Sequence, residues 1–254
     1  MSLIDAVIIG LVQGITEFLP ISSSGHLVIF QHLLNINLPG NLIEVAAHFG
    51  TLCSIVLIYW NEIIKLIIDF KSDKAQKYLL LLIVATLPSI IFVLFAKSFI
   101  LEMFESVKSV SIALIITGLA LLLSSFTKNR DKKINLSKGL LVGIAQAFAI
   151  IPGISRSGMT ISTALIAGVP SKEAAKFSFL LAIPAILGAI IITAIDIQYE
   201  FDNAIMFPII LTSVVSFISG YFALKILIRL LEAGKFYYFA YYCLLLGIFT
   251  LIIA

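Results

Sequence analysis

The chain has 254 residues, of which 61% are apolar and only 12% are charged, and its formal net charge is +3. Soluble domains contain about 45–50% apolar and about 25% charged residues, so this composition excludes a water-soluble globular protein. We therefore expect an integral membrane protein whose outer surface faces lipid, with no nucleic acid among its partners.

The first apolar region, residues 3–33, is interrupted near its middle. The interruption reads Phe18-Leu19-Pro20-Ile21-Ser22-Ser23-Ser24-Gly25-His26. The apolar piece on either side is shorter than the roughly 20 residues that a helix needs to cross the hydrocarbon core. Non-helical backbone survives at membrane depth only where it is buried in protein or faces a water-filled cavity. The pattern therefore predicts a re-entrant hairpin of two half-helices with the serines at its tip.

Uncharged runs then follow at 45–61, 78–96 and 109–127, and each is long enough to predict a transmembrane helix. A second interrupted region, 137–169, comes next and predicts a second re-entrant hairpin. Its centre reads Ile151-Pro152-Gly153-Ile154-Ser155-Arg156-Ser157-Gly158-Met159. Three more uncharged runs, 177–195, 204–224 and 236–254, complete a set of six predicted spans.

The second half of the chain repeats the first at an offset of 133 residues. The offset places Gly10 on Gly143, Gln13 on Gln146, Ile21 on Ile154, Ser22 on Ser155, Ser24 on Ser157 and Gly25 on Gly158. Repeat one would cover residues 1–133 and repeat two 134–254, within one membrane domain, 1–254. Because each repeat holds one hairpin and three crossings, the second copy must be inverted in the membrane. We expect an all-α polytopic membrane protein with six transmembrane helices and two re-entrant hairpins in an inverted-topology repeat, whose tips meet near the midplane.

The basic residues test this topology, because cytoplasmic loops carry the excess of lysine and arginine. The predicted topology places only Lys97 and Lys108 on the side of the N-terminus. It places fourteen basic residues on the opposite side: Lys65, Lys71, Lys74, Lys77, Lys128, Arg130, Lys132, Lys133, Lys138, Lys172, Lys176, Lys225, Arg229 and Lys235. That side is therefore expected to be cytoplasmic, with both termini outside.

Glu17 and Arg156 are charged residues far from any loop. Placing either one within the membrane costs about 2.5–3.5 kcal/mol on insertion scales. Mutual neutralisation is the plain structural explanation, but it does not account for the hydroxyls around them: Thr16, Ser22, Ser23, Ser24, Ser155, Ser157 and Thr160. The serines fall at the start of the second half-helix in both repeats, where free N–H groups and the dipole favour an anion. Ser22 or Ser155 alone is equally well explained as a helix N-cap.

Gln13 and Glu17 are four residues apart and therefore share one face of a helix. His26 follows the serines within one turn and is either a packing residue or a proton-transfer group beside Glu17 and Ser23. For His48 we expect a structural role, and for Glu44 an ordinary capping or interface role.

The first motif, from Gln13 to Leu27, closely resembles the first signature of bacterial undecaprenyl-diphosphate phosphatases, the bacitracin-resistance family. Pro152-Gly153-Ile154-Ser155-Arg156-Ser157-Gly158-Met159-Thr160 resembles its second signature, PGxSRSxxT. The resemblance implies hydrolysis of undecaprenyl diphosphate to undecaprenyl phosphate and inorganic phosphate, which recycles the lipid carrier for cell-wall synthesis. It also implies a plasma (inner) membrane protein of six spans and two re-entrant helix pairs, with the active site opening to the extracytoplasmic side.

The resemblance also implies roles for the polar residues. Glu17, Ser23, His26 and Arg156 would be catalytic, with Ser23 as nucleophile or phosphate ligand and His26 as general base or acid. Ser22, Ser24, Ser155, Arg156, Ser157 and Thr160 would bind the diphosphate. A divalent cation, Mg²⁺ or Ca²⁺, would bind at Glu17 and Gln13, although many members carry Glu where this chain has Gln13.

The expected partners are an isoprenoid lipid diphosphate and the lipid bilayer, and the sequence does not define an oligomeric state. Ser23 could attack the terminal phosphorus, or His26 and Glu17 could activate water. The main alternative function is a secondary transporter or lipid flippase, because inverted repeats with broken helices build many transporters. A non-catalytic scaffold is a third class, but a scaffold does not need Glu17 and Arg156 at midplane depth.

Overall fold

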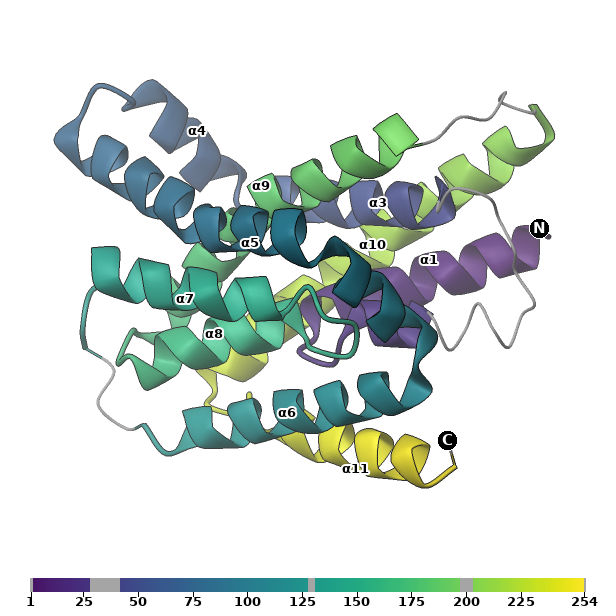
Figure 1. Cartoon of the computed structure of the whole chain (residues 1–254). Helices are drawn as coiled ribbons and strands as arrows, with labels where there is room; N and C mark the ends of the chain where they lie inside the picture. The colour runs from purple at the N-terminus through teal and green to yellow at the C-terminus, as the bar shows by residue number, and fades with distance from the viewer. Residues whose placement is uncertain (1, 28–41, 128–130, 197–202, 254) are drawn as a thin grey trace.

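The computed structural model describes residues 2–27, 42–127, 131–196 and 203–253, and within them every regular element is a helix (Figure 1). The helices are α1 (Leu3–Phe18), α3 (Leu42–Ile58), α4 (Trp60–Ile68), α5 (Asp73–Glu105), α6 (Val107–Ser125), α7 (Leu136–Phe148), α8 (Arg156–Ile166), α9 (Ser171–Asp196), α10 (Asn203–Glu232) and α11 (Tyr238–Ile253). Residues 23–27 are also helical. The predicted all-α class is confirmed.

Among the described residues, four helical segments are long and apolar enough to cross a membrane: Asp73–Ala96, Val107–Ser125, Ser171–Ile191 and Met206–Glu232. A fifth crossing arises if α3 and α4, which are bent by 71° at Tyr59, form one broken span. α11 is apolar but has only 16 residues, fewer than the roughly 17 of the shortest usual spans. The polytopic architecture therefore holds with four to five spans by length and composition, and six crossings stay a prediction.

The helices extend beyond the uncharged runs because caps and charges, not hydropathy, determine where a helix begins. α5 begins at Asp73, five residues before the predicted span, because the Ser72 side chain accepts a hydrogen bond from the Ala75 N–H. Lys74 and Lys77 lie in its first turns without ending it. The predicted span 45–61, in contrast, is not one straight helix, because it includes the sharp bend at Tyr59.

Small residues and hydroxyls allow the helices to pack closely. A Cβ on Gly14 of α1 would lie 2.6 Å from the Ser216 carbonyl of α10, and one on Gly143 of α7 would lie 2.3 Å from the Ala85 carbonyl of α5. The Ser216 hydroxyl in turn donates to the Ala47 carbonyl of α3 at 2.7 Å. Such contacts are typical of membrane helices, where packing and interhelical hydrogen bonds replace the hydrophobic drive between helices.

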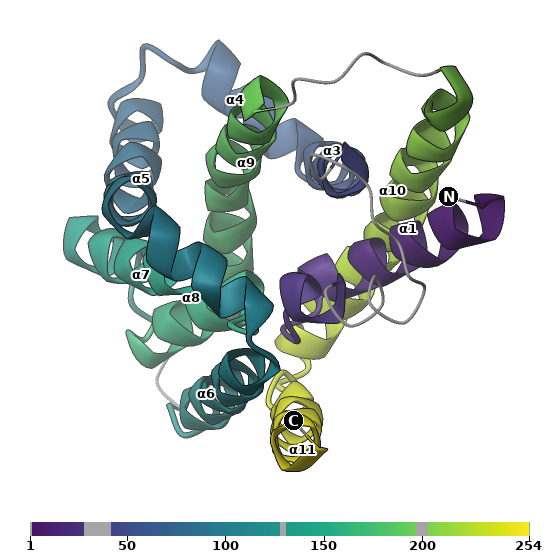
Figure 2. The same cartoon turned by 45° about the vertical axis from the view of Figure 1, so that its right-hand side comes forward.

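The bundle contains two interrupted helix pairs. α1 and residues 23–27 form the first pair, and α7 and α8 form the second. α1 packs against α10 and α7 against α5, while α6 and α11 lie side by side (Figures 1 and 2). This arrangement brings the interruption of each pair to the centre of the molecule.

Candidate active site

The first interruption follows from Pro20. α1 ends at Phe18, and Leu19 takes an extended conformation (φ −62°, ψ 140°) because a residue before proline is disfavoured in the helical region. Ser22 then has φ +69°, a left-handed conformation that is uncommon outside glycine. The helix restarts at residue 23, so the turn projects three consecutive serines next to the end of α1.

The second interruption is built from a glycine and a regular cap. Gly153 has φ +92°, and a Cβ there would lie 2.4 Å from the Val110 carbonyl of α6. Ser155 is the N-cap of α8, and its hydroxyl accepts from the Gly158 N–H at 3.1 Å. Arg156 is therefore the first residue of α8, at the positive end of the helix dipole.

The two interruptions meet at Glu17. Arg156 donates from Nη2 to Glu17 Oε1 at 2.6 Å, and Ser23 donates from Oγ to Glu17 Oε2 at 2.6 Å. Gln13 adds a donor bond from Nε2 to the same Oε2 at 3.1 Å. The prediction that Glu17 and Arg156 share one site is confirmed. Ser23 and Arg156 also occupy equivalent positions at the offset of 133 residues. The Glu17 carboxylate therefore contacts the same position in both halves of the chain.

This contact is buried, with Glu17 only 8% exposed and its partner side chain 14% exposed. Removing one member of a buried ion pair usually costs about 3–5 kcal/mol, because the remaining charge stays unpaired. Arg156 Nη1 is itself buried and has no hydrogen-bond partner among the described residues. A guanidinium with one nitrogen held and the other unpartnered can bind a phosphate oxygen.

A cavity of 270 Å³ opens beside this contact. Of the predicted site residues, it is lined by Glu17, Ser22, Ser23, Ser24, Ser155 and Arg156. Three residues of α9, Ala185, Ile186 and Ala189, form part of its apolar wall. A polar site with an apolar wall suits a ligand that has a charged head and a hydrocarbon tail.

Sequence reasoning missed the contribution of α3. His48 and Glu44 both line the cavity, and His48 Nε2 lies 3.9 Å from Glu17 Oε2. His48 Nδ1 donates to the Glu44 carbonyl at 2.7 Å, which leaves Nε2 as the ring nitrogen nearest the carboxylate. The expected purely structural role of His48 therefore does not fit its position. The available signal was the four-residue spacing of Glu44 and His48, which places both on one helix face.

Four predicted residues do not line this cavity: Gln13, which is buried beside Glu17, and His26, Ser157 and Thr160. His26 is 7% exposed and bonded at both ring nitrogens, to the Ser22 carbonyl at 2.8 Å and to the Tyr242 hydroxyl of α11 at 2.7 Å. Ser157 lies 3.2 Å from the Ser155 hydroxyl, and Thr160 bonds to the Arg156 carbonyl at 2.8 Å. His26, Ser157 and Thr160 support the turns; the acid–base role of His26 and the phosphate contacts of Ser157 and Thr160 stay predictions.

A divalent cation finds a limited set of donors in this site. Among the described residues, no group of three or more His, Cys, Asp or Glu side chains is placed to hold a metal. Gln13, however, is fully buried beside Glu17, and its Oε1 has no partner among the described residues. Mg²⁺ commonly takes only one or two carboxylates and fills its shell with substrate phosphates and water. The residues therefore fit a cation held mainly by a diphosphate, and not a cage built from protein alone.

Known proteins match the chain over almost its whole length. A family model described as bacitracin resistance protein BacA matches residues 6–249. A protein of Halothermothrix orenii named undecaprenyl-diphosphatase is 41% identical, over 100% of this chain and 99% of its own length. One of the same name from Carboxydothermus hydrogenoformans is 40% identical, over 100% and 98%. Undecaprenyl-diphosphatase 2 of Bacillus thuringiensis is 37% identical, over 96% and 95%.

Proposed function

The chain belongs to the bacitracin resistance protein family, and from this premise we propose that it hydrolyses undecaprenyl diphosphate to undecaprenyl phosphate and inorganic phosphate. The relatives named undecaprenyl-diphosphatase support the substrate, and the reaction would return the lipid carrier to cell-wall synthesis. Within the structure, the proposal depends on one observation: Glu17, Ser23 and Arg156 meet in a single polar cavity.

The cavity supplies hydrogen-bond donors for a diphosphate, and a divalent cation would offset the two carboxylates in its lining, Glu17 and Glu44. Arg156 is held at Nη2 by Glu17, so its unpartnered Nη1 is positioned for a phosphate oxygen. The N-terminus of α8 adds free N–H groups and a dipole worth up to about 2 kcal/mol when partly buried. The hydroxyls of Ser22, Ser24 and Ser155 provide further donors around the cavity. The isoprenoid tail would lie against the apolar wall formed by α9.

Ser23 is the nucleophile that this geometry favours, because its hydroxyl already donates to Glu17 Oε2. In the first step Ser23 Oγ bonds to the terminal phosphorus, and the bond from that phosphorus to the bridging oxygen breaks. Undecaprenyl phosphate leaves with the electron pair, and the Ser23 proton passes to Glu17. In the second step water gives a proton to Glu17 and its oxygen bonds to phosphorus. The bond from phosphorus to Ser23 Oγ breaks, inorganic phosphate leaves, and the proton passes from Glu17 back to Ser23 Oγ. Binding of the diphosphate at Arg156 would free Glu17 to accept the proton.

His48 is positioned to move a second proton. Its Nδ1 hydrogen bond to the Glu44 carbonyl orients Nε2 toward Glu17, across 3.9 Å. Nε2 could relay the proton from Glu17 to the departing oxygen. His26 would act through the turn: its bonds to Ser22 and Tyr242 hold the backbone from which Ser23 projects.

A Mg²⁺ or Ca²⁺ ion would be held by Glu17 and the unpartnered Oε1 of Gln13, together with oxygens of the diphosphate. When bound, such an ion neutralises charge on the phosphates and favours departure of the leaving group. Its requirement can be tested by removing divalent cations with a chelator and restoring each one in turn.

We also propose the finer architecture: six crossings and two re-entrant hairpins in repeats 1–133 and 134–254, inverted with respect to each other. The packing supports this, because equivalent helices of the two repeats make equivalent contacts. α1 packs on α10, and its equivalent α7 packs on α5. Likewise α3 packs on α10, and its equivalent α9 packs on α5. The first turn of α1 and the last turn of α11 also lie at the same end of the bundle (Figure 1). The termini and the opening of the active site would face the extracytoplasmic side of the plasma membrane.

The topology is tested by single cysteines at Ser2 and Lys133, with Cys53 and Cys243 replaced by serine. A membrane-impermeant maleimide added to intact cells should label position 2 at once and position 133 only after permeabilisation. The reverse pattern would overturn the proposed orientation.

The function is tested with the pure full chain in detergent and undecaprenyl diphosphate, by measuring phosphate release. We expect turnover by the wild type and none above background by Arg156→Ala. A transporter or flippase needs two compartments, so absence of phosphate release in detergent, with reconstituted transport present, would favour that alternative.

A further inference from the structure

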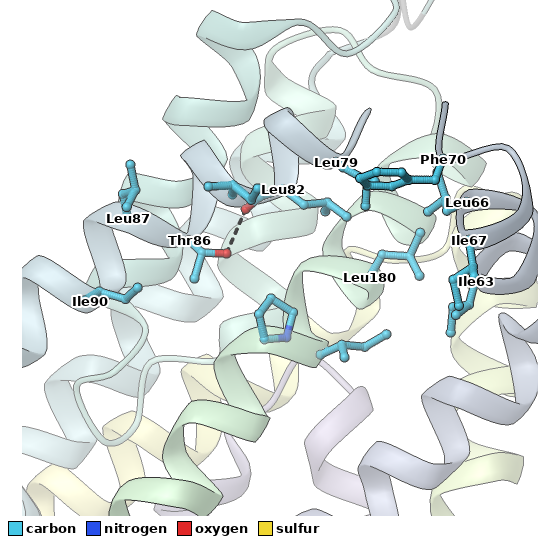
Figure 3. A pocket seen from close by; sticks show the side chains of 13 residues that line it. Ile63, Leu66, Ile67, Phe70, Leu79, Leu82, Thr86, Leu87, Ile90 and Leu180 are labelled. Atoms are coloured by element: carbon cyan, nitrogen blue, oxygen red, sulfur yellow. Dashed lines mark hydrogen bonds between the residues drawn. The ribbon is translucent and has the colours of Figure 1, made fainter. Parts of the chain in front are cut away.

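A long apolar groove lies away from the active site, between α4, α5 and α9 (Figure 3). It encloses 670 Å³ and follows α5 from Leu79 to Ile90, about 16 Å at 1.5 Å per residue. Thr86 is its one residue with a polar side chain, and that hydroxyl is engaged by the Leu82 carbonyl at 2.8 Å. The groove therefore offers hydrocarbon contact and no free hydrogen-bonding group along its length.

A polar cavity of 380 Å³ adjoins the groove and shares Leu66 and Leu180 with it. Lys65, Lys74 and Lys176 line this cavity, together with the carboxylates of Glu62 and Asp69. Within the described part of the chain, none of the three lysines is ion-paired with either carboxylate. Three cations thus lie at the head of an apolar groove, together with two carboxylates of the lining and Glu173 near Tyr78.

Tyr78 supplies an independent sign of a missing partner. It lines the polar cavity, and its hydroxyl is buried without a hydrogen-bond partner among the described residues. The Lys176 ammonium lies 5.7 Å from the centre of its ring. An unsatisfied buried hydroxyl is costly, so a site of this kind normally receives an acceptor. A phosphate oxygen between the hydroxyl and the ammonium would satisfy both.

We propose that the groove and the polar cavity together bind one anionic phospholipid, with an acyl chain along α5 and its phosphate at Tyr78, Lys65, Lys74 and Lys176. The topology proposed above places these lysines on the cytoplasmic side, where anionic lipids attract clustered basic residues. The site is separate from the active site, because Leu180 and Ile183 of α9 line the groove while Ala185 and Ala189 line the catalytic cavity. The α3–α4 bend of 71° places α4 against the groove.

Native mass spectrometry of the detergent-solubilised full chain tests this site with dioleoyl phosphatidylglycerol, dioleoyl phosphatidylcholine and a polyprenyl monophosphate as separate probes. We expect one phosphatidylglycerol bound per chain, at least about fivefold more tightly than phosphatidylcholine, since each surface lysine contributes roughly 1 kcal/mol toward an anionic lipid. Equal affinity for the two phospholipids would overturn the proposal. Preferential binding of the polyprenyl monophosphate, displacing phosphatidylglycerol, would overturn the choice of lipid.

Two variants and two matched controls locate the site. Ile83→Trp fills the groove, and the triple change of Lys65, Lys74 and Lys176 to glutamine removes the basic head. Each should weaken phosphatidylglycerol binding by about tenfold or more. Leu80→Trp, at another exposed position of α5, and glutamine at Lys71, Lys77 and Lys133 should leave it unchanged. Equal losses in variants and controls, at unchanged thermal unfolding midpoints, would contradict the site. Because the measurement is binding, its outcome is independent of phosphate release.

Discussion

The two interrupted helix pairs share a backbone design but carry different chemistry. Ser22 and Ser155 each accept from the N–H three residues later, at 3.4 and 3.1 Å, and each lies next to the hydroxyl of the serine two residues on. At the next position, however, the first pair has Ser23 and the second has Arg156. Both reach the same Glu17, whose own equivalent in the second pair is Ile150.

The comparison shows how duplication of a fold can produce an asymmetric site. Two similar turns bring two helix N-termini together. These N-termini gather N–H groups and hydroxyls, and this part of the design needs no catalytic side chain. The first copy then supplies the carboxylate and a hydroxyl, and the second copy supplies the cation. A site built in this way should fail when either specialised residue is lost, and should tolerate changes at the unspecialised equivalents.

Besides the loss expected for Arg156→Ala, the largest effect is expected at Glu17, which connects the two halves. Glu17→Gln keeps an oxygen for Arg156 but removes the negative charge and the proton acceptor, so we expect phosphate release to fall by about 10³-fold or more. Initial rates in detergent with undecaprenyl diphosphate measure the effect. Ile150→Val, at the equivalent position of the second pair, should stay within a few fold of wild type. Turnover by Glu17→Gln close to that of Ile150→Val would remove the carboxylate from the mechanism.

The second prediction concerns Ser23, the counterpart of Arg156. Ser23→Ala should lower turnover by at least about 10²-fold, since it removes the attacking oxygen. Quenching the wild type with substrate labelled at the terminal phosphate should trap a phosphoserine, and the variant should trap none. Ser24→Ala, which also lines the cavity, is the matched control and should still form the intermediate. Full turnover without any trapped intermediate would favour direct attack by water.

The third prediction separates the two histidines. His48→Gln should lower kcat by about 10²-fold, the lower end for loss of a general acid–base group, with little change in thermal stability. His26→Gln should mainly lower the unfolding midpoint, because His26 connects Ser22 to Tyr242. Tyr242→Phe removes only the second of these contacts and should reproduce part of that loss. If His26→Gln abolished turnover at an unchanged midpoint while His48→Gln did not, the roles would be reversed.

Much of this arrangement could be predicted from the sequence because its signals are local or repeated. Pro20 and Gly153 mark the interruptions, and the offset of 133 residues pairs them, so the meeting of Glu17 with Arg156 followed from topology. Hydropathy alone located the apolar helices, although it could not show that Tyr59 bends the α3–α4 segment by 71° or that α11 is short.

The contributions from other elements could not be predicted in the same way. His48 and Tyr242 reach the turns from α3 and α11. The spacing of Glu44 and His48 indicates a shared helix face, but not that this face meets the turns. Whether the imidazole of His26 faces the cavity or the neighbouring helix depends on packing across more than 200 positions of the chain. Sequence proximity favoured His26 over His48, and the tertiary structure reverses their distances from Glu17.

The smallest expected effect concerns the backbone of the two turns. Ser22 has φ +69°, where a side chain costs about 1–2 kcal/mol relative to the right-handed region, whereas Ser155 has the φ of −75° of an ordinary cap. Ser22→Gly should therefore be neutral or stabilise the fold by up to about 1 kcal/mol, and Ser155→Gly should destabilise it by a few tenths. Unfolding in a denaturing-detergent titration compares the two variants with wild type. The Ser22 hydroxyl lines the cavity, so its loss would remove a hydrogen-bond donor from the site even where the backbone gains stability. Ser22→Gly should accordingly lose phosphate release by severalfold while remaining folded, and a stable variant with full turnover would show that the left-handed turn alone, without its hydroxyl, suffices to present Ser23.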